Sequence, residues 1–96
     1  IKNPTATFFV RVNGDSMINA GIHDNDILIV DRSLKPTHGK IVIAVVDGQM
    51  TVKRLYKQSG KLFLIPENKN FKPIEIIENM SMEIWGIVIT AIHSLY

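Results

Sequence analysis

The dipeptide Asp47-Gly48 lies between two apolar runs, KIVIAVV and MTVKRLY. Asp-Gly in this setting is a strong signal for a two-residue β-hairpin, because both central residues of a type I′ turn need a positive φ. The turn also fixes the register, since the paired residues continue outward from it until Ile41 faces Arg54. We therefore expect an antiparallel hairpin of defined register in the middle of the chain.

This register places one cation on each face of the hairpin. Lys53 shares its face with Thr51 and with Val42 across the pair, whereas Arg54 lies on the opposite face. An arginine keeps its charge at every accessible pH, but a lysine removed from water can lose its proton, because burial disfavours the charged form. If one of the two cations has a chemical role, Lys53 is the better candidate.

The rest of the chain has the same strand-like character. β-Branched residues dominate short runs that Gly, Asn, Asp and Pro interrupt, which is typical of strands. The segment SMINA differs, and there we expect a short helical turn with Ser16 or Asp15 as its N-cap. The expected strands are residues 8–12, 27–31, 40–46, 50–56, 61–65, 74–77 and 83–93. The sequence, residues 1–96, thus predicts one all-β or nearly all-β domain.

Composition and charge narrow the classes of function. With 96 residues, 46% of them hydrophobic and 21% charged, the chain is long enough for one globular core. It has no cysteine, which excludes disulfides and thiolate metal sites. Its net charge of +2 comes from 11 basic residues scattered among 9 acidic ones, so no basic patch indicates direct nucleic-acid binding. No apolar run approaches the ~20 residues that span a bilayer, and we expect a cytoplasmic protein that contacts no membrane.

Ser16 stands in the compact block GDSM, with an apolar run on each side. A nucleophilic serine needs a neighbouring base to take its proton, and in the Ser-His-Asp triad that base is a histidine. The three histidines of the chain, His23, His38 and His93, lack the sequence setting of a triad base. The proton acceptor for Ser16 must therefore come from elsewhere, and Lys53 is the candidate.

His23 lies close in sequence to Asp24 and Asp26, which are residue types that can bind a metal ion. We interpret the three residues as a tight polar turn rather than a metal site, because no further cluster of ligands is evident in the sequence. We therefore predict neither a metal nor another cofactor.

Several blocks along the chain together resemble a known family. They are GDSM, GIHDNDILIVD, HGKIVIAVVDG, TVKRL, LIPEN and WGIVI, which lie between Phe8 and His93. Their order and spacing resemble those of the LexA/UmuD family of self-cleaving serine peptidases, most closely its UmuD branch. One departure is Asn25, where the family commonly has glycine, although Asn also tolerates the left-handed conformation. The resemblance implies a compact domain of curled antiparallel sheets, like the C-terminal domain of LexA.

The resemblance also implies the catalytic residues. In the family, the serine of the GDSM block and the lysine of the VK.L block form a Ser-Lys dyad, here Ser16 and Lys53. We expect neutral Lys53 to take the Ser16 proton, so that the alkoxide attacks a peptide carbonyl and an acyl-enzyme forms and is hydrolysed. The backbone N–H groups of Asp15 and Ser16 are candidates for holding the oxyanion. Thr51, two residues before Lys53 on the same face, is a candidate for orienting the amine.

Family members cleave a bond in their own N-terminal arm, which by family spacing would lie upstream of Ile1. We therefore expect this chain to be the processed or truncated form, without that arm. The UmuD-like interpretation implies a bacterial SOS-response protein whose self-cleavage is prompted by a RecA nucleoprotein filament. Its processed form would be an accessory subunit of a UmuC-type translesion polymerase. It also implies a homodimer, which would bury the apolar run EIWGIVITAIHSLY.

Two other classes of function stay open. The chain could be the C-terminal dimerisation and self-cleavage domain of a LexA-like or phage transcriptional repressor, which an upstream helix-turn-helix domain would indicate. It could also be an interaction module with an inactive dyad, which trapping of Ser16 by an acylating reagent would exclude.

Overall fold

The computed structural model describes residues 6–95, which form seven strands and one short 3-10 helix. The expectation of a nearly all-β domain is confirmed, and no strand end differs from its predicted position by more than two residues. Within the described residues, no helix is long and apolar enough to cross a membrane. The elements are β1 (Thr7–Arg11), η2 (Ile18–Ala20), β2 (Ile27–Asp31), β3 (Ile41–Val46), β4 (Gln49–Gln58), β5 (Lys61–Ile65), β6 (Ile74–Ile76) and β7 (Met82–Ile92).

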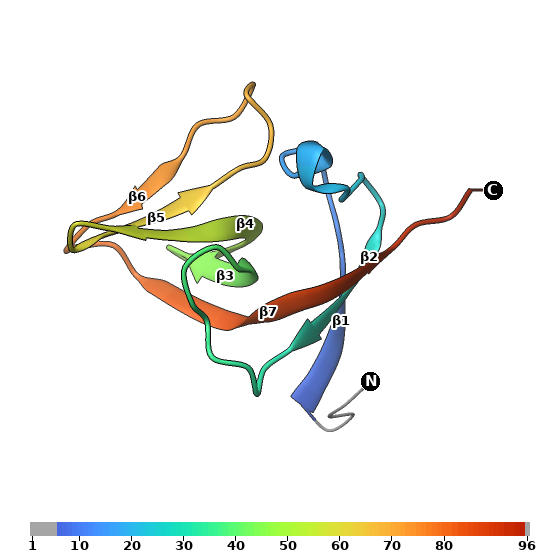
Figure 1. Cartoon of the computed structure of the whole chain (residues 1–96), viewed down its shortest axis with the longest axis horizontal. Helices are drawn as coiled ribbons and strands as arrows, with labels where there is room; N and C mark the ends of the chain where they lie inside the picture. The colour runs from blue at the N-terminus through green and yellow to red at the C-terminus, as the bar shows by residue number, and fades with distance from the viewer. Residues whose placement is uncertain (1–5, 96) are drawn as a thin grey trace.

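All seven strands join in one antiparallel sheet, in the order β1-β2-β7-β3-β4-β5-β6. The long strand β7 crosses the molecule and pairs with β2 towards its end and with β3 towards its start (Figure 1). Its pairing shifts register at Ile29/Val30 of β2 and at Ile43/Ala44 of β3. Such bulges increase the local twist of a sheet. The family resemblance implied several curled antiparallel sheets, and the structure has one curled sheet instead.

The curled sheet has two hydrophobic cores. Adjacent residues of β3, Val42 and Ile43, belong to different cores because side chains alternate between the faces of a strand. β3 is therefore covered on both faces. The first core contains Val12, Met17, Ile22, Leu28, Val30 and Ile43. The second contains Val42, Ala44, Leu55, Leu64 and Ile87.

The β3–β4 hairpin has the predicted register. The pairs run without interruption from Val46 opposite Gln49 to Ile41 opposite Arg54. The turn residues Asp47 and Gly48 have φ values of 48° and 83°. Both values are positive, as a type I′ turn requires, and the prediction drawn from Asp-Gly is confirmed.

A second two-residue turn, at Ser59 and Gly60, extends β4 beyond its predicted end. These residues have φ values of 51° and 76°, and the turn brings Gln58 opposite Lys61 of β5. This hairpin was not predicted from the sequence, because serine is not among the residues that usually adopt the left-handed conformation.

The helical turn after Ser16 is shorter than predicted, and the expected N-cap was wrong. The helix η2 begins at Ile18, and its N-cap is Met17, which makes no side-chain capping hydrogen bond. The turn is closed instead by backbone groups, since Ile18 N donates to the Asp15 carbonyl at 3.2 Å. Met17 is almost fully buried and anchors the segment in the first core. The Ser16 hydroxyl does not cap the helix, because it faces Lys53.

Gly86 lies where β7 passes very close to β2. A Cβ added at Gly86 would lie 2.7 Å from Val30 Cγ1 and 2.9 Å from the Asp31 carbonyl oxygen. These distances are too short for real contacts, and the carbonyl belongs to a paired strand. The close packing of β2 against β7 therefore depends on the absence of a side chain at this position.

We predict that Gly86→Ala lowers the free energy of unfolding by about 1–3 kcal/mol, the usual cost of overpacking a filled interior. Urea unfolding monitored by circular dichroism measures the change. Lys61→Ala, at an exposed position of β5, is the control and should change the stability by about 0.5 kcal/mol or less. Equal stability of Gly86→Ala and the wild-type chain would contradict the close approach.

Candidate active site

Lys53 is a buried lysine in the middle of β4. Its residue is 8% exposed, and it lies opposite Val42 of β3. Val42 and the neighbouring Leu55 are fully buried members of the second core. A lysine amine is strongly hydrated in water, so this position needs other polar partners for the amine.

The structure supplies three oxygen partners for the Lys53 amine. Nζ lies 2.7 Å from Thr51 Oγ1, 3.1 Å from the Val52 carbonyl oxygen and 3.1 Å from Ser16 Oγ. Thr51 and Val52 belong to the same strand as Lys53, whereas Ser16 reaches the amine from the loop between β1 and η2. The fold thus brings together two residues that are 37 positions apart in the sequence.

The three oxygen partners suit both charge states of the amine, and the charge state decides the direction of the contact with Ser16. A neutral –NH₂ group has two N–H donors and one lone pair, and the Val52 carbonyl can only accept a hydrogen bond. If the two N–H groups donate to Val52 and Thr51, the lone pair is directed at Ser16 and can accept its hydroxyl proton. A charged –NH₃⁺ group would donate to all three oxygens, and Ser16 would keep its proton.

Burial favours the neutral form of this amine. Desolvation lowers the pKa of Lys53 below the ordinary value for lysine, because the charged form loses its hydration. Among residues 6–95, none of the carboxylates forms an ion pair with Lys53 that would oppose this effect.

Arg54, the neighbouring cation, has a different environment. Its Nε forms an ion pair with Glu67 Oε1, and its Nη1 donates to the Gly39 carbonyl at 2.6 Å. Its side chain is 34% exposed. Lys53 and Arg54 therefore lie on opposite faces of β4, as the alternation of side chains predicted. Arg54 makes structural contacts on its face.

The loop after β5 holds the segment that carries Ser16. Glu67 N donates to the Ser16 carbonyl at 2.9 Å, and the Glu67 carbonyl accepts from Asn19 N at 2.9 Å. Asn68 Nδ2 donates to the Asp15 carbonyl at 2.9 Å. In Figure 1 this loop, between β5 and β6, approaches the helical turn η2. The segment that carries Ser16 is thus fixed by contacts from a loop far along the chain.

Sequence reasoning did not identify Glu67 or Asn68 as residues that position the site. They stand in the block LIPEN, which contributed only to the family resemblance. The block contains no signal for the partners of its backbone groups, because these depend on how β4 and β5 lie beside the Ser16 loop.

Two backbone amides next to the serine have no protein partner. Within residues 6–95, neither Asp15 N nor Ser16 N donates a hydrogen bond. Both residues lie in an accessible loop, with Asp15 exposed and Ser16 partly exposed. Free N–H groups beside a nucleophile are the groups that can hold an oxyanion.

A cleft of about 390 Å³ opens beside Ser16 and Lys53. Its floor and walls are largely apolar, and the polar atoms of Ser16, Thr51 and Lys53 lie along it. The apolar lining includes Val10, Val12, Leu28, Met50, Val52 and Phe71. Such a cleft has the shape and chemistry to hold a peptide segment with its carbonyl near Ser16.

The structure thus brings Ser16, Thr51 and Lys53 together. The turn at His23, Asp24 and Asp26 lies at a different pocket, although the Asp24 carboxylate accepts a hydrogen bond from Gly14 N at 2.7 Å. That turn has the predicted conformation, since Asn25 has a φ of 74°.

Comparisons with known proteins agree with the family resemblance. A sequence model described as Peptidase S24-like matches residues 1–89 of the chain. Protein MucA from Salmonella typhimurium and from Escherichia coli is 48% identical over 90 residues, which are 92% of this chain and 60% of MucA. The LexA repressor of Clostridium perfringens is 43% identical over 82 residues, which are 85% of this chain and 40% of the repressor. The chain therefore spans between two fifths and three fifths of the length of these relatives.

The low pKa of Lys53 has a consequence for stability. Between the folded-state pKa and the higher unfolded-state pKa, the unfolded chain binds more protons, so the free energy of unfolding rises with pH across this window. We predict that Lys53→Met, which keeps the side-chain volume but cannot titrate, lacks this rise. Its stability advantage over the wild-type chain should be largest below the folded-state pKa and should decline as pH increases.

Urea unfolding at a series of alkaline pH values measures this difference. The control is Lys57→Met, which replaces an exposed lysine of the same strand and should retain the wild-type pH dependence. Parallel curves for the wild-type chain and Lys53→Met throughout the alkaline range would contradict the lowered pKa.

Proposed function

The chain belongs to the Peptidase S24-like family, and we propose that it is a self-cleaving serine peptidase in which Ser16 is the nucleophile and Lys53 the general base. The observation that carries this proposal is the distance of 3.1 Å between Lys53 Nζ and Ser16 Oγ, in a lysine residue that is only 8% exposed. A lysine acts as a base only when it is neutral, and desolvation is the established way to make it so near physiological pH.

The proposed reaction has two steps. Lys53 takes the hydroxyl proton of Ser16, and Oγ attacks the carbonyl carbon of a peptide bound in the cleft. When the C–N bond breaks, the Lys53 ammonium returns a proton to the leaving amine, and an ester to Ser16 remains. Water then attacks the ester with Lys53 again as base, which releases the new carboxylate and restores the serine.

Three further groups have supporting roles in this proposal. The free amides of Asp15 and Ser16 donate to the oxyanion of each tetrahedral intermediate. Thr51 accepts a hydrogen bond from the amine at 2.7 Å and so directs the lone pair at Ser16. No metal ion or organic cofactor takes part in these steps.

We further propose a role in the SOS response to DNA damage. The sequence blocks of the UmuD branch support a chain whose self-cleavage is prompted by a RecA nucleoprotein filament and whose processed form is an accessory subunit of a UmuC-type translesion polymerase. The alternative is the self-cleavage domain of a transcriptional repressor, which the 43% identity to a LexA repressor supports. The upstream sequence of the natural protein distinguishes them, because a repressor carries a helix-turn-helix domain there.

We predict that Ser16→Ala, Lys53→Ala and Lys53→Arg each reduce cleavage by at least about 100-fold, the lower end of a general base's contribution. Lys53→Arg is informative because a guanidinium cannot give up its proton. Wild-type cleavage should accelerate as pH rises through the folded-state pKa of Lys53, because the neutral fraction increases. Cleavage is measured by gel electrophoresis in a chain with the N-terminal segment of Escherichia coli MucA placed before Ile1.

Lys57→Arg, at an exposed position of the same strand, is the control and should cleave normally. A second readout is the mass increase when a fluorophosphonate phosphonylates the serine with loss of fluoride, which Ser16→Ala should abolish. Near-wild-type cleavage by Lys53→Arg with an unchanged pH profile would show that another group is the base. Failure of the reagent to label wild-type Ser16 would favour an inactive interaction module.

A homodimer is also part of the proposal. Phe9 of β1 pairs with Ile29 of β2, and Ile29 pairs with Thr90 of β7, so the three residues share one face of the sheet. Phe9 is 64% exposed, and Ile92, two positions after Thr90 on β7, is 51% exposed. An apolar sheet face of this kind is suited to an isologous contact with a second copy.

We predict that sedimentation equilibrium at micromolar concentrations shows a dimer and that Phe9→Asp converts it to a monomer, because a charge cannot be buried unpaired in the contact. Leu34→Asp serves as the control, since Leu34 is 43% exposed in the loop between β2 and β3, outside the three strands that form this face, and its replacement should leave the dimer intact. A wild-type chain that sediments only as a monomer would contradict the dimer.

A further inference from the structure

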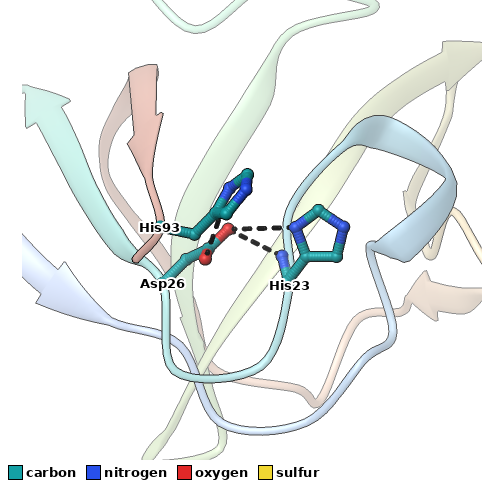
Figure 2. Close-up of side chains that lie close together, drawn as sticks. All are labelled: His23, Asp26 and His93. Carbon is teal, nitrogen blue, oxygen red and sulfur yellow. Dashed lines mark hydrogen bonds and ion pairs between the residues drawn. The ribbon is translucent and has the colours of Figure 1, made fainter. Parts of the chain in front are cut away.

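Two histidines and an aspartate meet at the end of the sheet opposite the β3–β4 turn, and one of them, His93, is distant in the sequence from the other two. Asp26 directly precedes β2, His23 lies three residues earlier, and His93 follows the last residue of β7. His23 Nδ1 lies 3.7 Å from Asp26 Oδ2, and His93 Nδ1 lies 3.9 Å from Asp26 Oδ1. Figure 2 shows the two imidazoles on different sides of the carboxylate. The pairing of β2 with β7 brings His93 to this turn.

One carboxylate oxygen of Asp26 is buried without a hydrogen-bond partner among the described residues. The side chain is 1% exposed, and only Oδ2 has a hydrogen bond, from His23 N at 2.7 Å. Oδ1 is buried and accepts no hydrogen bond from the described residues. A carboxylate oxygen that loses its hydration without gaining a partner is costly. The unpaired oxygen faces His93, and a cation between the two groups would satisfy it.

We propose that His23, Asp26 and His93 form a binding site for a divalent transition-metal ion of the zinc type. One ligand atom from each of the three residues lies within 4.8 Å of the other two. Zinc binds imidazole nitrogen and carboxylate oxygen at about 2.0–2.2 Å. Ligand atoms that bind such an ion at these distances lie roughly 3–4 Å from one another. Small side-chain rotations would therefore bring the three ligand atoms, now within 4.8 Å of one another, to bonding positions. Imidazole ligands select zinc, nickel or copper over magnesium and calcium.

The side chains have the freedom to make these rotations. The imidazoles of His23 and His93 are 46% and 42% exposed, and they contact each other edge to face with centroids 4.7 Å apart. The buried Asp26 is held from the backbone side by His23 N and provides a fixed ligand. Two partly exposed imidazoles can therefore rotate to close around an ion that the fixed carboxylate also binds.

The surrounding pocket leaves room for the remaining ligands. It has a volume of about 570 Å³, which admits the water molecules that would complete a coordination sphere with three protein ligands. Its other charged groups are Asp24 and Arg11. Arg11 donates through Nη1 to the carbonyl and Oδ1 oxygens of Asn25, at 3.1 Å each, so its guanidinium is engaged away from Asp26.

An ion at this site would join the end of β7 to the turn before β2. That turn continues from Ile22 and Met17, two members of the first core. Binding to the folded chain alone would raise its stability in proportion to the logarithm of the ion concentration. The proposal is independent of the peptidase function, because neither Ser16 nor Lys53 lines this pocket.

Isothermal titration of Zn²⁺ into the chain, without an affinity tag and after treatment with a chelator, tests the proposal. We expect saturable binding of one ion per chain and a rise in melting temperature. His23→Gln and His93→Gln should each weaken binding by at least about tenfold, because the loss of even an outer-shell partner of a ligand costs about 10–100-fold in metal affinity. His38→Gln is the matched control, because His38 is exposed and lies away from the pocket.

A second measurement needs no variant. In the NMR spectrum of the wild-type chain, Zn²⁺ should shift the imidazole resonances of His23 and His93 and leave those of His38 unchanged. The proposal fails if the wild-type chain shows no saturable binding, or if both glutamine variants bind Zn²⁺ as the wild-type chain does. It also fails if His38 is the histidine that responds.

Discussion

The removal of one lysine amine from water is the interaction on which the candidate site depends. Lys53 lies between buried residues of the β3–β4 hairpin, and desolvation lowers its pKa. The hairpin register determines this environment, and a shift of one residue would move Lys53 to the other face of β4. The turn at Asp47-Gly48, the pairing with Val42 and the contact with Ser16 are therefore parts of one arrangement.

β4 helps to position both Lys53 and Ser16. Lys53 points to Ser16, while Arg54, the next residue, pairs with Glu67 on the other side. The backbone of Glu67 in turn holds the Ser16 segment at two points. The proposed nucleophile and the proposed base are thus positioned from adjacent residues of one strand, which limits how far their distance can vary. Catalytic groups need this support from rigid elements.

The strands and the hairpin register could be predicted from the sequence, because turn chemistry and side-chain alternation are local properties. The start of η2 at Ile18 was missed, since Ser16 is drawn to Lys53 by a contact 37 residues away. The support from Glu67 and the approach of His93 to Asp26 were missed for the same reason. Both depend on the strand order, which places β7 between β2 and β3, and local patterns do not contain that order.

The central claim is that the Lys53 amine is neutral at a pH where an ordinary lysine is charged. NMR titration of the chain with ¹³C-labelled lysine, in which the Cε resonance of Lys53 is assigned by its loss in Lys53→Met, measures this directly. Our account predicts that Lys53 titrates at a clearly lower pH than the exposed lysines of the same chain. A Lys53 resonance that titrates together with those of the exposed lysines would contradict it.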